Sequence, residues 1–199
     1  MRPKNIEKEN AIKSIALQMI AEEGLENFSM QKLAKAANIS PRTIYLKYEN
    51  KDDLLIKLYI EEVLGAYEKA ILQDFSEDTP FAEGVKKLWQ NGYRYLKNNK
   101  HHFALIQHGK ASPFLNRAFQ QANITEGQFF SPIPAFFKRH AATGLIPKLP
   151  FDIYRAMMFA PLLDLVNEYF DYEQRPKQII TEKIIITCCD MVIKSMLNA

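Results

Sequence analysis

Residues 29–48 read SMQKLAKAANISPRTIYLKY, and they carry the strongest structural signal of the sequence. Ser29 and Ser40 each stand where a helix N-cap is expected, because a short side-chain oxygen accepts a hydrogen bond from the free N–H groups of a first turn. Asn38 tolerates the left-handed backbone that a tight turn needs, and Pro41 suits the first position of a helix. The stretch therefore predicts two short helices joined by a tight turn, the layout of a helix-turn-helix.

A longer helix is predicted on each side of this stretch. From Ile12 to Ile20 apolar residues recur at the spacing of one helical face, and Gly24 then supplies a stop. Asn50 caps a fourth helix, whose apolar pattern continues to Ile71, or about six turns. That length exceeds the needs of a small DNA-binding domain, so we expect this helix to connect the domain to the C-terminal part of the chain.

The rest of the chain also has helical periodicity, and no segment alternates as a strand does. Further helices are expected from Thr79-Pro80 to Leu96, over 100–110, over 113–142 with breaks near Pro132 and Pro134, over 151–172 with a kink at Pro161, and over 176–197. The predicted fold class is all-α. An N-terminal three-helix domain, residues 1–50, is joined by the long helix to a C-terminal helical domain, residues 51–199.

The third helix is predicted to present a small polar face. At ~100° per residue, Ile44 and Tyr48 share the inner face, which leaves Arg42 and Leu46 on the opposite side. An arginine pairs bidentately with guanine, and a leucine can touch a thymine methyl group. Thr43, Tyr45, Lys47 and Lys51 are suited to phosphates, and the helix N-termini capped by Ser29 and Ser40 also attract phosphate.

The charge distribution agrees with a nucleic-acid partner. The net charge of the chain is only +3, but five bases and one acid lie between Ser29 and Lys51. Phosphates attract such a basic patch, although patches of this size also occur on surfaces that bind nothing.

From Ile12 to Leu58 the sequence resembles the DNA-binding domain of the TetR (tetracycline repressor-like) family of bacterial transcriptional regulators. The resemblance covers about a quarter of the chain. It is carried by Ala16, Ile20, Gly24, Phe28, Leu33-Ala34, Ile39-Ser40, Thr43-Ile44-Tyr45, Tyr48, Asn50-Lys51 and Leu54-Leu55. It implies that Pro41, Arg42, Tyr45 and Leu46 face the groove, while Ser29, Thr43, Lys47, Tyr48 and Lys51 reach the DNA backbone. Arg42 departs from the pattern, because many members have a small or flexible residue there. We expect it to contact a base, with a phosphate contact as the alternative.

The resemblance also implies that the C-terminal domain binds a ligand and forms a dimer. Apolar and aromatic residues of the middle helices are the candidate lining of a pocket for an apolar or aromatic effector: Trp89, Tyr93, Phe103, Gln107, Phe130, Phe137, Met157 and Met158. For any single one of them a plain core position is the alternative. The last two helices are apolar on several sides, which favours a homodimer interface over burial within one chain.

The expected function is a repressor that binds a palindromic operator as a homodimer and is released by its ligand. An activator is an open alternative, and so are a helical enzyme and a protein-binding scaffold. The chain lacks a glycine-rich phosphate loop and the histidine motifs of metal enzymes, so no enzymatic activity, cofactor or metal is expected. A scaffold would leave the basic cluster unexplained. The adjacent cysteines Cys188 and Cys189 suggest packing rather than redox sensing. No apolar run reaches membrane-spanning length, and a cytoplasmic location is expected.

Overall fold

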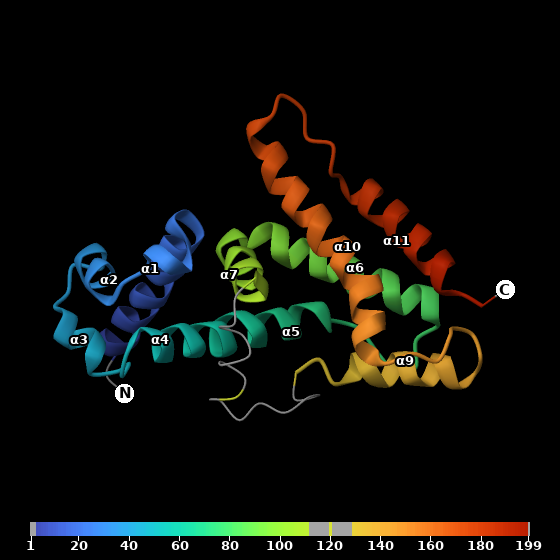
Figure 1. Cartoon of the computed structure of the whole chain (residues 1–199), viewed down its shortest axis with the longest axis horizontal. Coiled ribbons are helices and arrows are strands. Elements are labelled where there is room, and N and C mark those ends of the chain that lie inside the picture. Colours follow the sequence, from blue (N-terminus) through green and yellow to red (C-terminus); the bar gives the residue numbers. More distant parts are fainter. Residues whose placement is uncertain (1–2, 112–119, 121–128, 199) are drawn as a thin grey trace. The chain divides into compact units, whose positions relative to one another are not determined.

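The computed structural model describes residues 3–111, 120 and 129–198 (Figure 1). Every regular element in those ranges is helical, which confirms the all-α prediction. The elements are α1 (Pro3–Asn27), α2 (Met30–Ala36), α3 (Pro41–Tyr45), α4 (Lys51–Lys57), η1 (Leu58–Leu64), α5 (Gly65–Ile71), α6 (Phe81–Asn98), α7 (Lys100–Ala111), α9 (Pro132–Ala142), α10 (Phe151–Asp171), η2 (Tyr172–Gln174) and α11 (Glu182–Met196).

The described residues form two compact units. The first takes its residues from Met1–Ala66 and Asn99–Thr125, and the second from Tyr67–Asn98 and Glu126–Ala199. The first unit therefore holds the predicted helix-turn-helix together with α7, which packs against α1. The predicted domains, 1–50 and 51–199, are a division by function and remain a prediction, whereas the compact units reflect packing.

Capping residues set the boundaries of the short helices in the first unit. The side chains of Ser29, Ser40 and Asn50 accept hydrogen bonds from backbone N–H groups at 3.2, 3.3 and 2.9 Å. Asn38 has a φ of 51°, the left-handed conformation expected of the turn, and Gly24 interrupts α1 with a φ of 79°. The helix boundaries predicted around this turn are confirmed.

The long fourth helix is present, but its middle is not an ordinary α-helix. The run from Lys51 to Ile71 consists of α4, the π-helical segment η1 and α5. At the end of η1 the N–H of Gly65 bonds the carbonyl of Ile60, five residues back. π-Helical turns are rare and often mark functional positions. Apolar periodicity alone did not reveal the π-helical turn. The apolar side chains of η1 still lie on the buried side of the helix, so their spacing resembles that of an ordinary α-helix.

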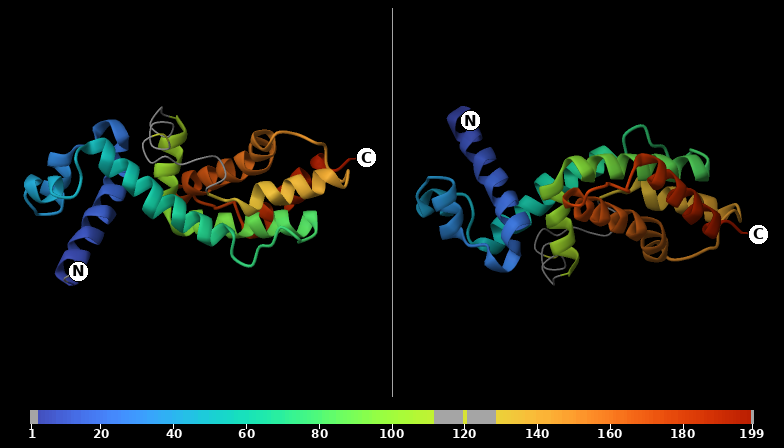
Figure 2. Two further views of the ribbon diagram at one scale, coloured as in Figure 1. Left: turned by 90° about the horizontal axis from the view of Figure 1, so that it is seen from below. Right: turned by 90° about the horizontal axis from the view of Figure 1, so that it is seen from above.

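The second unit is built around α6, with α10 and α11 packed along it (Figures 1 and 2). Seven other residues of α6 are buried along with Trp89, and two of these are glycines. Gly84 lies against the ring of Phe136 in α9, and Gly92 lies against Leu162 in α10. Small residues at these two positions let the neighbouring helices approach the α6 backbone closely.

One predicted boundary in this unit is wrong. The last helix begins at Glu182 and not near Pro176, because Thr181 caps it by accepting the N–H of Ile184 at 3.3 Å. The break expected near Pro132 is present, because residues 129–131 are not helical and α9 begins at Pro132, where a missing N–H costs little. Pro134 does not interrupt α9. Most of the predicted stretch before Pro132 lies outside the described residues. Helix α10 continues through Pro161.

Among the described residues, the helices are all too short or too polar to cross a lipid bilayer.

A methyl group added at Gly84 is expected to destabilise the second unit. Its Cβ would lie 2.6 and 2.7 Å from two ring carbons of Phe136. That ring is fully buried, with ring centroids 5.7 Å from Phe81 and 5.3 Å from Phe75, so it has little room to retreat. We expect Gly84→Ala to lower the free energy of unfolding in urea by about 1–3 kcal/mol.

The matched control is Gly65→Ala. Gly65 has helical dihedral angles, and the nearest atom to an added Cβ is the Ile60 carbonyl oxygen at 3.8 Å. This substitution should raise the free energy of unfolding by about 0.5–1 kcal/mol, because it restricts the unfolded chain. Equal effects of the two substitutions would contradict the close contact at Gly84.

Candidate nucleic-acid interface

Helix α3 presents one exposed face. Tyr45 is 51% exposed and Leu46 is 78% exposed, and Arg42 and Pro41 are exposed as well. Behind them Ile44 is completely buried, as the helical spacing predicts. Four of the predicted contact residues therefore project together from one short element that is fixed on its inner side.

Serine and threonine hydroxyls brace the start of α3. The Ser40 and Thr43 side-chain oxygens are 3.0 Å apart, and the Thr43 N–H donates to the Ser40 oxygen. Ser29 makes the equivalent capping bond at α2. These three predicted phosphate contacts are thus already used to hold helix starts, although a hydroxyl that caps a helix can still meet a phosphate through its remaining donor or acceptor capacity.

Most bases of the patch have partners within the first unit. Lys32 bonds Glu23 at 2.7 Å, Lys47 pairs with Glu9, and Lys51 donates to the Leu25 carbonyl at 2.8 Å. In the described part of the chain, Lys35 and Arg42 show no such pairing. Arg42 is therefore the cation of α3 that is available to an external partner.

An ionic network connects Lys47, just after α3, to the π-helical segment. Glu9 of α1 pairs with Lys47 and lies 3.5 Å from Lys13, and Lys13 pairs with Glu62 of η1 at 2.5 Å. The hydrogen bond from Lys47 lowers the pKa of the Glu9 carboxyl. Burial opposes the charged form of Lys13, but the hydrogen bond and charge of Glu62 raise its pKa overall. Both groups stay charged at neutral pH.

This network was not predicted from the sequence. The pair Glu9 and Lys13, four residues apart on one helix, was a detectable signal. The link from Glu9 to Lys47 was not detectable, because it joins residues far apart in the chain.

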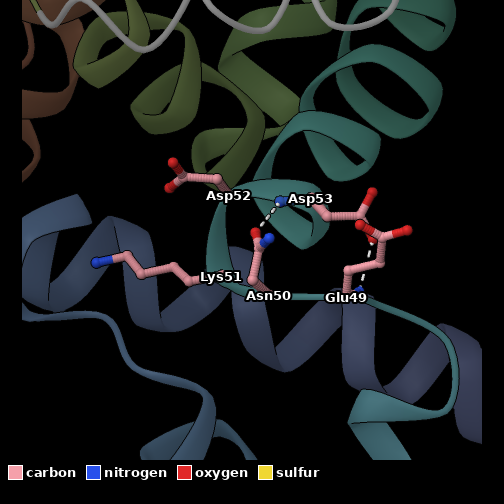
Figure 3. Close-up of a pocket in the computed structure, with 5 residues that line it drawn as sticks. All are labelled: Glu49, Asn50, Lys51, Asp52 and Asp53. Carbon is pink, nitrogen blue, oxygen red and sulfur yellow. Dashed lines mark hydrogen bonds between the residues drawn. The ribbon is translucent and has the colours of Figure 1, made fainter.

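A shallow polar depression lies at the start of α4, lined by residues 49–53 (Figure 3). Asn50 caps the helix within it, and Asp53 accepts the backbone N–H of Glu49 at 3.0 Å. The Lys51 side chain extends away from Glu49 and Asp53. Carboxylates repel phosphate, and Asp52 and Asp53 lie in the first turn of α4, so this depression is unsuited to a nucleic-acid backbone.

Two of the predicted backbone contacts lie inward. Tyr48 is buried, as its spacing predicts, and this ring belongs to the core of the unit. Burial raises the pKa of its phenol. Lys51 is partly buried, and its ammonium lies 5.9 Å from the ring centroid of Phe28. Both residues support the helix-turn-helix from behind, whatever their contact with DNA.

The candidate pocket residues fall into both compact units. Phe103 and Gln107 lie on α7 in the first unit. Trp89, Tyr93, Phe137 and Met158 are buried in the core of the second unit, and Phe130 is partly buried there. Met157 is 42% exposed and lies outside that core. These positions do not define the lining of a single ligand pocket.

The cysteine and histidine residues show no reactive arrangement in the described ranges. Cys189 is buried, and burial raises the pKa of its thiol to about 12, so the thiol stays protonated and unreactive. Histidine, cysteine and acidic residues do not gather in these ranges into a group of three that would hold a metal ion.

Residues 12–58 match the sequence profile of the bacterial regulatory proteins of the tetR family. An uncharacterized HTH-type transcriptional regulator of Haemophilus influenzae is 27% identical over 187 residues, which cover 93% of this chain and 95% of that protein. A TetR family transcription regulator of Marinobacter aquaeolei has a similar structure over 100% of both chains, with a TM-score of 0.79 at 24% identity. The regulator FadR of Bacillus subtilis, solved in complex with stearoyl-CoA, matches 94% of this chain and 96% of its own with a TM-score of 0.66 at 21% identity.

The matched stretch begins in α1 and ends at the start of η1, so it contains the braced helix-turn-helix and its exposed face. The family's role is regulatory rather than enzymatic. Residues 12–58 therefore carry the sequence signature of the bacterial regulatory proteins of the tetR family, and over nearly its whole length the chain is similar to an HTH-type transcriptional regulator and to a TetR family structure.

Proposed function

We propose that the protein is a cytoplasmic repressor that binds a palindromic operator as a homodimer, with α3 in the major groove. The observation that carries this proposal is the exposed face of Arg42, Tyr45 and Leu46 on a helix whose other side is buried. One cation free to pair with guanine and one apolar side chain able to meet a thymine methyl group provide readout of bases. Two such helices in a dimer would meet successive major grooves.

The proposed dimer uses the outer faces of α10 and α11. Both helices pack on α6, yet each leaves apolar side chains uncovered on its other side. Ile153 and Met157 of α10 are 44% and 42% exposed, and Ile184 and Met191 of α11 are 39% and 65% exposed. Exposed apolar residues at helical spacing on two adjacent helices suit a self-complementary interface between identical subunits.

The proposed effector has a long apolar body. The second unit is rich in buried aromatic and aliphatic side chains, and a structural neighbour binds stearoyl-CoA. We take a long-chain acyl compound as the effector class. Its binding would shift the population toward a form with low operator affinity. The helical run from Lys51 to Ile71 contains residues of both units and is the expected connection.

Selection from randomised duplex DNA tests the proposal and the role of Arg42. The wild-type protein should enrich a palindrome. Arg42→Ala should lose preference at one base pair of each half-site, at about 1–3 kcal/mol, because a bidentate base contact is lost. Lys35→Ala is the matched control: this exposed lysine is outside α3, so its loss should weaken binding to all sequences alike. Sequence-blind binding by the wild type would contradict the proposal.

Removing the charge of Glu9 should strengthen DNA binding without changing its specificity. Glu9 holds Lys47, so Glu9→Gln frees that ammonium for a phosphate. We expect a several-fold gain in affinity at low salt, and a slope of log K against log salt that is steeper by roughly 0.9. Fluorescence anisotropy over a salt series measures both quantities.

Glu26→Gln makes the same charge change at an exposed position of α1 and is the control. A general electrostatic effect would make the two variants alike. If Glu9→Gln leaves the slope unchanged, Lys47 does not reach a phosphate.

A charge on the outer face of α11 should break the dimer. Met191→Glu places a carboxylate where the interface is proposed, and a desolvated, unpaired charge is costly. Sedimentation velocity should show a dimer for the wild type and a monomer for Met191→Glu. Lys183→Glu, an exposed position of the same helix away from that face, changes the charge by more and should remain dimeric. A monomeric wild type, or dimers of both variants, would overturn the proposed interface.

A further inference from the structure

The only tryptophan of the chain has a buried donor without an acceptor. Trp89 lies on α6 and is 0% exposed. Its indole Nε1 has no hydrogen-bond partner among the described residues. An unsatisfied buried donor costs about 1–3 kcal/mol, and such groups are uncommon in folded proteins. Such a donor is explained if a bound molecule supplies the missing acceptor.

The surroundings of Trp89 are apolar and closely packed. One turn further along α6, the position of a Cβ on Gly92 lies 3.1 Å from Leu162 of α10, 3.3 Å from the Tyr67 hydroxyl and 3.6 Å from Ile71. Residues three apart on a helix are neighbours, so these groups flank the side of α6 that carries Trp89. Burial raises the pKa of the Tyr67 phenol well above its usual range.

The charges near this region decide which acceptor is suitable. None of the buried residues in the described ranges is charged. A ligand carboxylate buried at Trp89 would therefore have no buried cation of the described residues to pair with, and burial of an unpaired charge is costly. A neutral carbonyl oxygen avoids this cost.

We infer that the indole N–H of Trp89 donates a hydrogen bond to a neutral carbonyl oxygen of the effector, an ester or thioester of a long acyl chain. This inference rests on the proposed function and specifies its effector: an acylated molecule, not a free fatty acid. The apolar side chains around α6 would have to separate to admit the acyl chain, and Trp89 is the polar group that would fix its position. Pockets for small molecules are mainly apolar, with a few placed polar groups that provide specificity.

Access to Trp89 requires side chains to move apart, and α10 lacks one backbone hydrogen bond at this point. Pro161 has no N–H, so the carbonyl of Met157 lacks its helical donor close to where Leu162 approaches Gly92. We therefore expect the ligand to enter where α10 meets α6.

A single indole makes the inference directly measurable. In 1H–15N spectra of the full-length protein, the one indole N–H signal belongs to Trp89. Titration with stearoyl-CoA should move this proton signal downfield in step with release of operator DNA. Stearate and CoA alone, at the same concentrations, should leave the signal in place.

An isosteric variant separates the hydrogen bond from packing. Benzothienylalanine at position 89 keeps both rings and replaces the N–H by sulfur. Affinity for stearoyl-CoA should fall about tenfold, the loss expected for one hydrogen bond in an apolar site. Trp89→Phe should lose at least as much affinity, and it serves as a genetically simple second variant.

Each other outcome overturns the inference in a distinguishable way. If stearoyl-CoA releases DNA but the indole signal stays, or the isostere binds as well as the wild type, the Trp89 assignment fails and the repressor proposal stands. If stearate acts like stearoyl-CoA, the neutral acceptor is wrong. An indole proton already at a hydrogen-bonded shift in the free protein assigns a water as its partner. If none of the three compounds binds, both the proposed acyl effector and the role of Trp89 are wrong. The proposal that α3 binds an operator is then still tested by selection from randomised DNA.

Discussion

The exposed face of α3 depends on the burial of one side chain, Ile44. A helix as short as Pro41–Tyr45 is not stable by itself, because the conformational entropy lost in nucleation exceeds the stabilisation from the hydrogen bonds of a single turn. Its conformation is imposed from behind, where Ile44 is completely buried and Tyr48 nearly so. The Ser40 cap and the left-handed Asn38 set where the helix starts. The direction in which Arg42 and Leu46 project is therefore decided by apolar contacts on the opposite side.

The distribution of charge restricts the same face further. Three of the five bases between residues 29 and 51 are held by acids or carbonyls of their own unit, so the basic patch is weaker than its composition suggests. This arrangement favours discrimination over general affinity, since phosphate contacts add strength without reading sequence. The ion pairs of Lys47, Glu9, Lys13 and Glu62 also connect η1 to the charges beside α3. A π-helical turn is rare and is frequently found at functional sites.

Local patterns predicted the first unit well because its structure is determined locally. Caps, the turn asparagine and the inner face of α3 each depend on residues within a few positions of one another, and all were confirmed. The start of α11 was missed because Thr181 caps the helix inside an apolar run whose periodicity extends further back. The π-helical segment and the pairing of Lys47 with Glu9 were missed for a different reason. Both depend on packing between distant parts of the chain, which one sequence does not encode in its spacing.

The second unit differs from the first in having two features that a single chain leaves unsatisfied. Outside, α10 and α11 leave apolar side chains partly uncovered, from 39% of Ile184 to 65% of Met191. Inside, Trp89 keeps a donor without an acceptor among the described residues. Marginal stability leaves little room for unsatisfied groups that serve no purpose. Under the proposed function each feature has its complement, the partner subunit on the surface and the acyl carbonyl in the core. Helix α10 links the exposed apolar face to the core around Trp89. It exposes Ile153 and Met157 on the proposed dimer face, and it also brings Leu162 against α6. A ligand that displaces Leu162 would therefore act on the dimer face of the same helix.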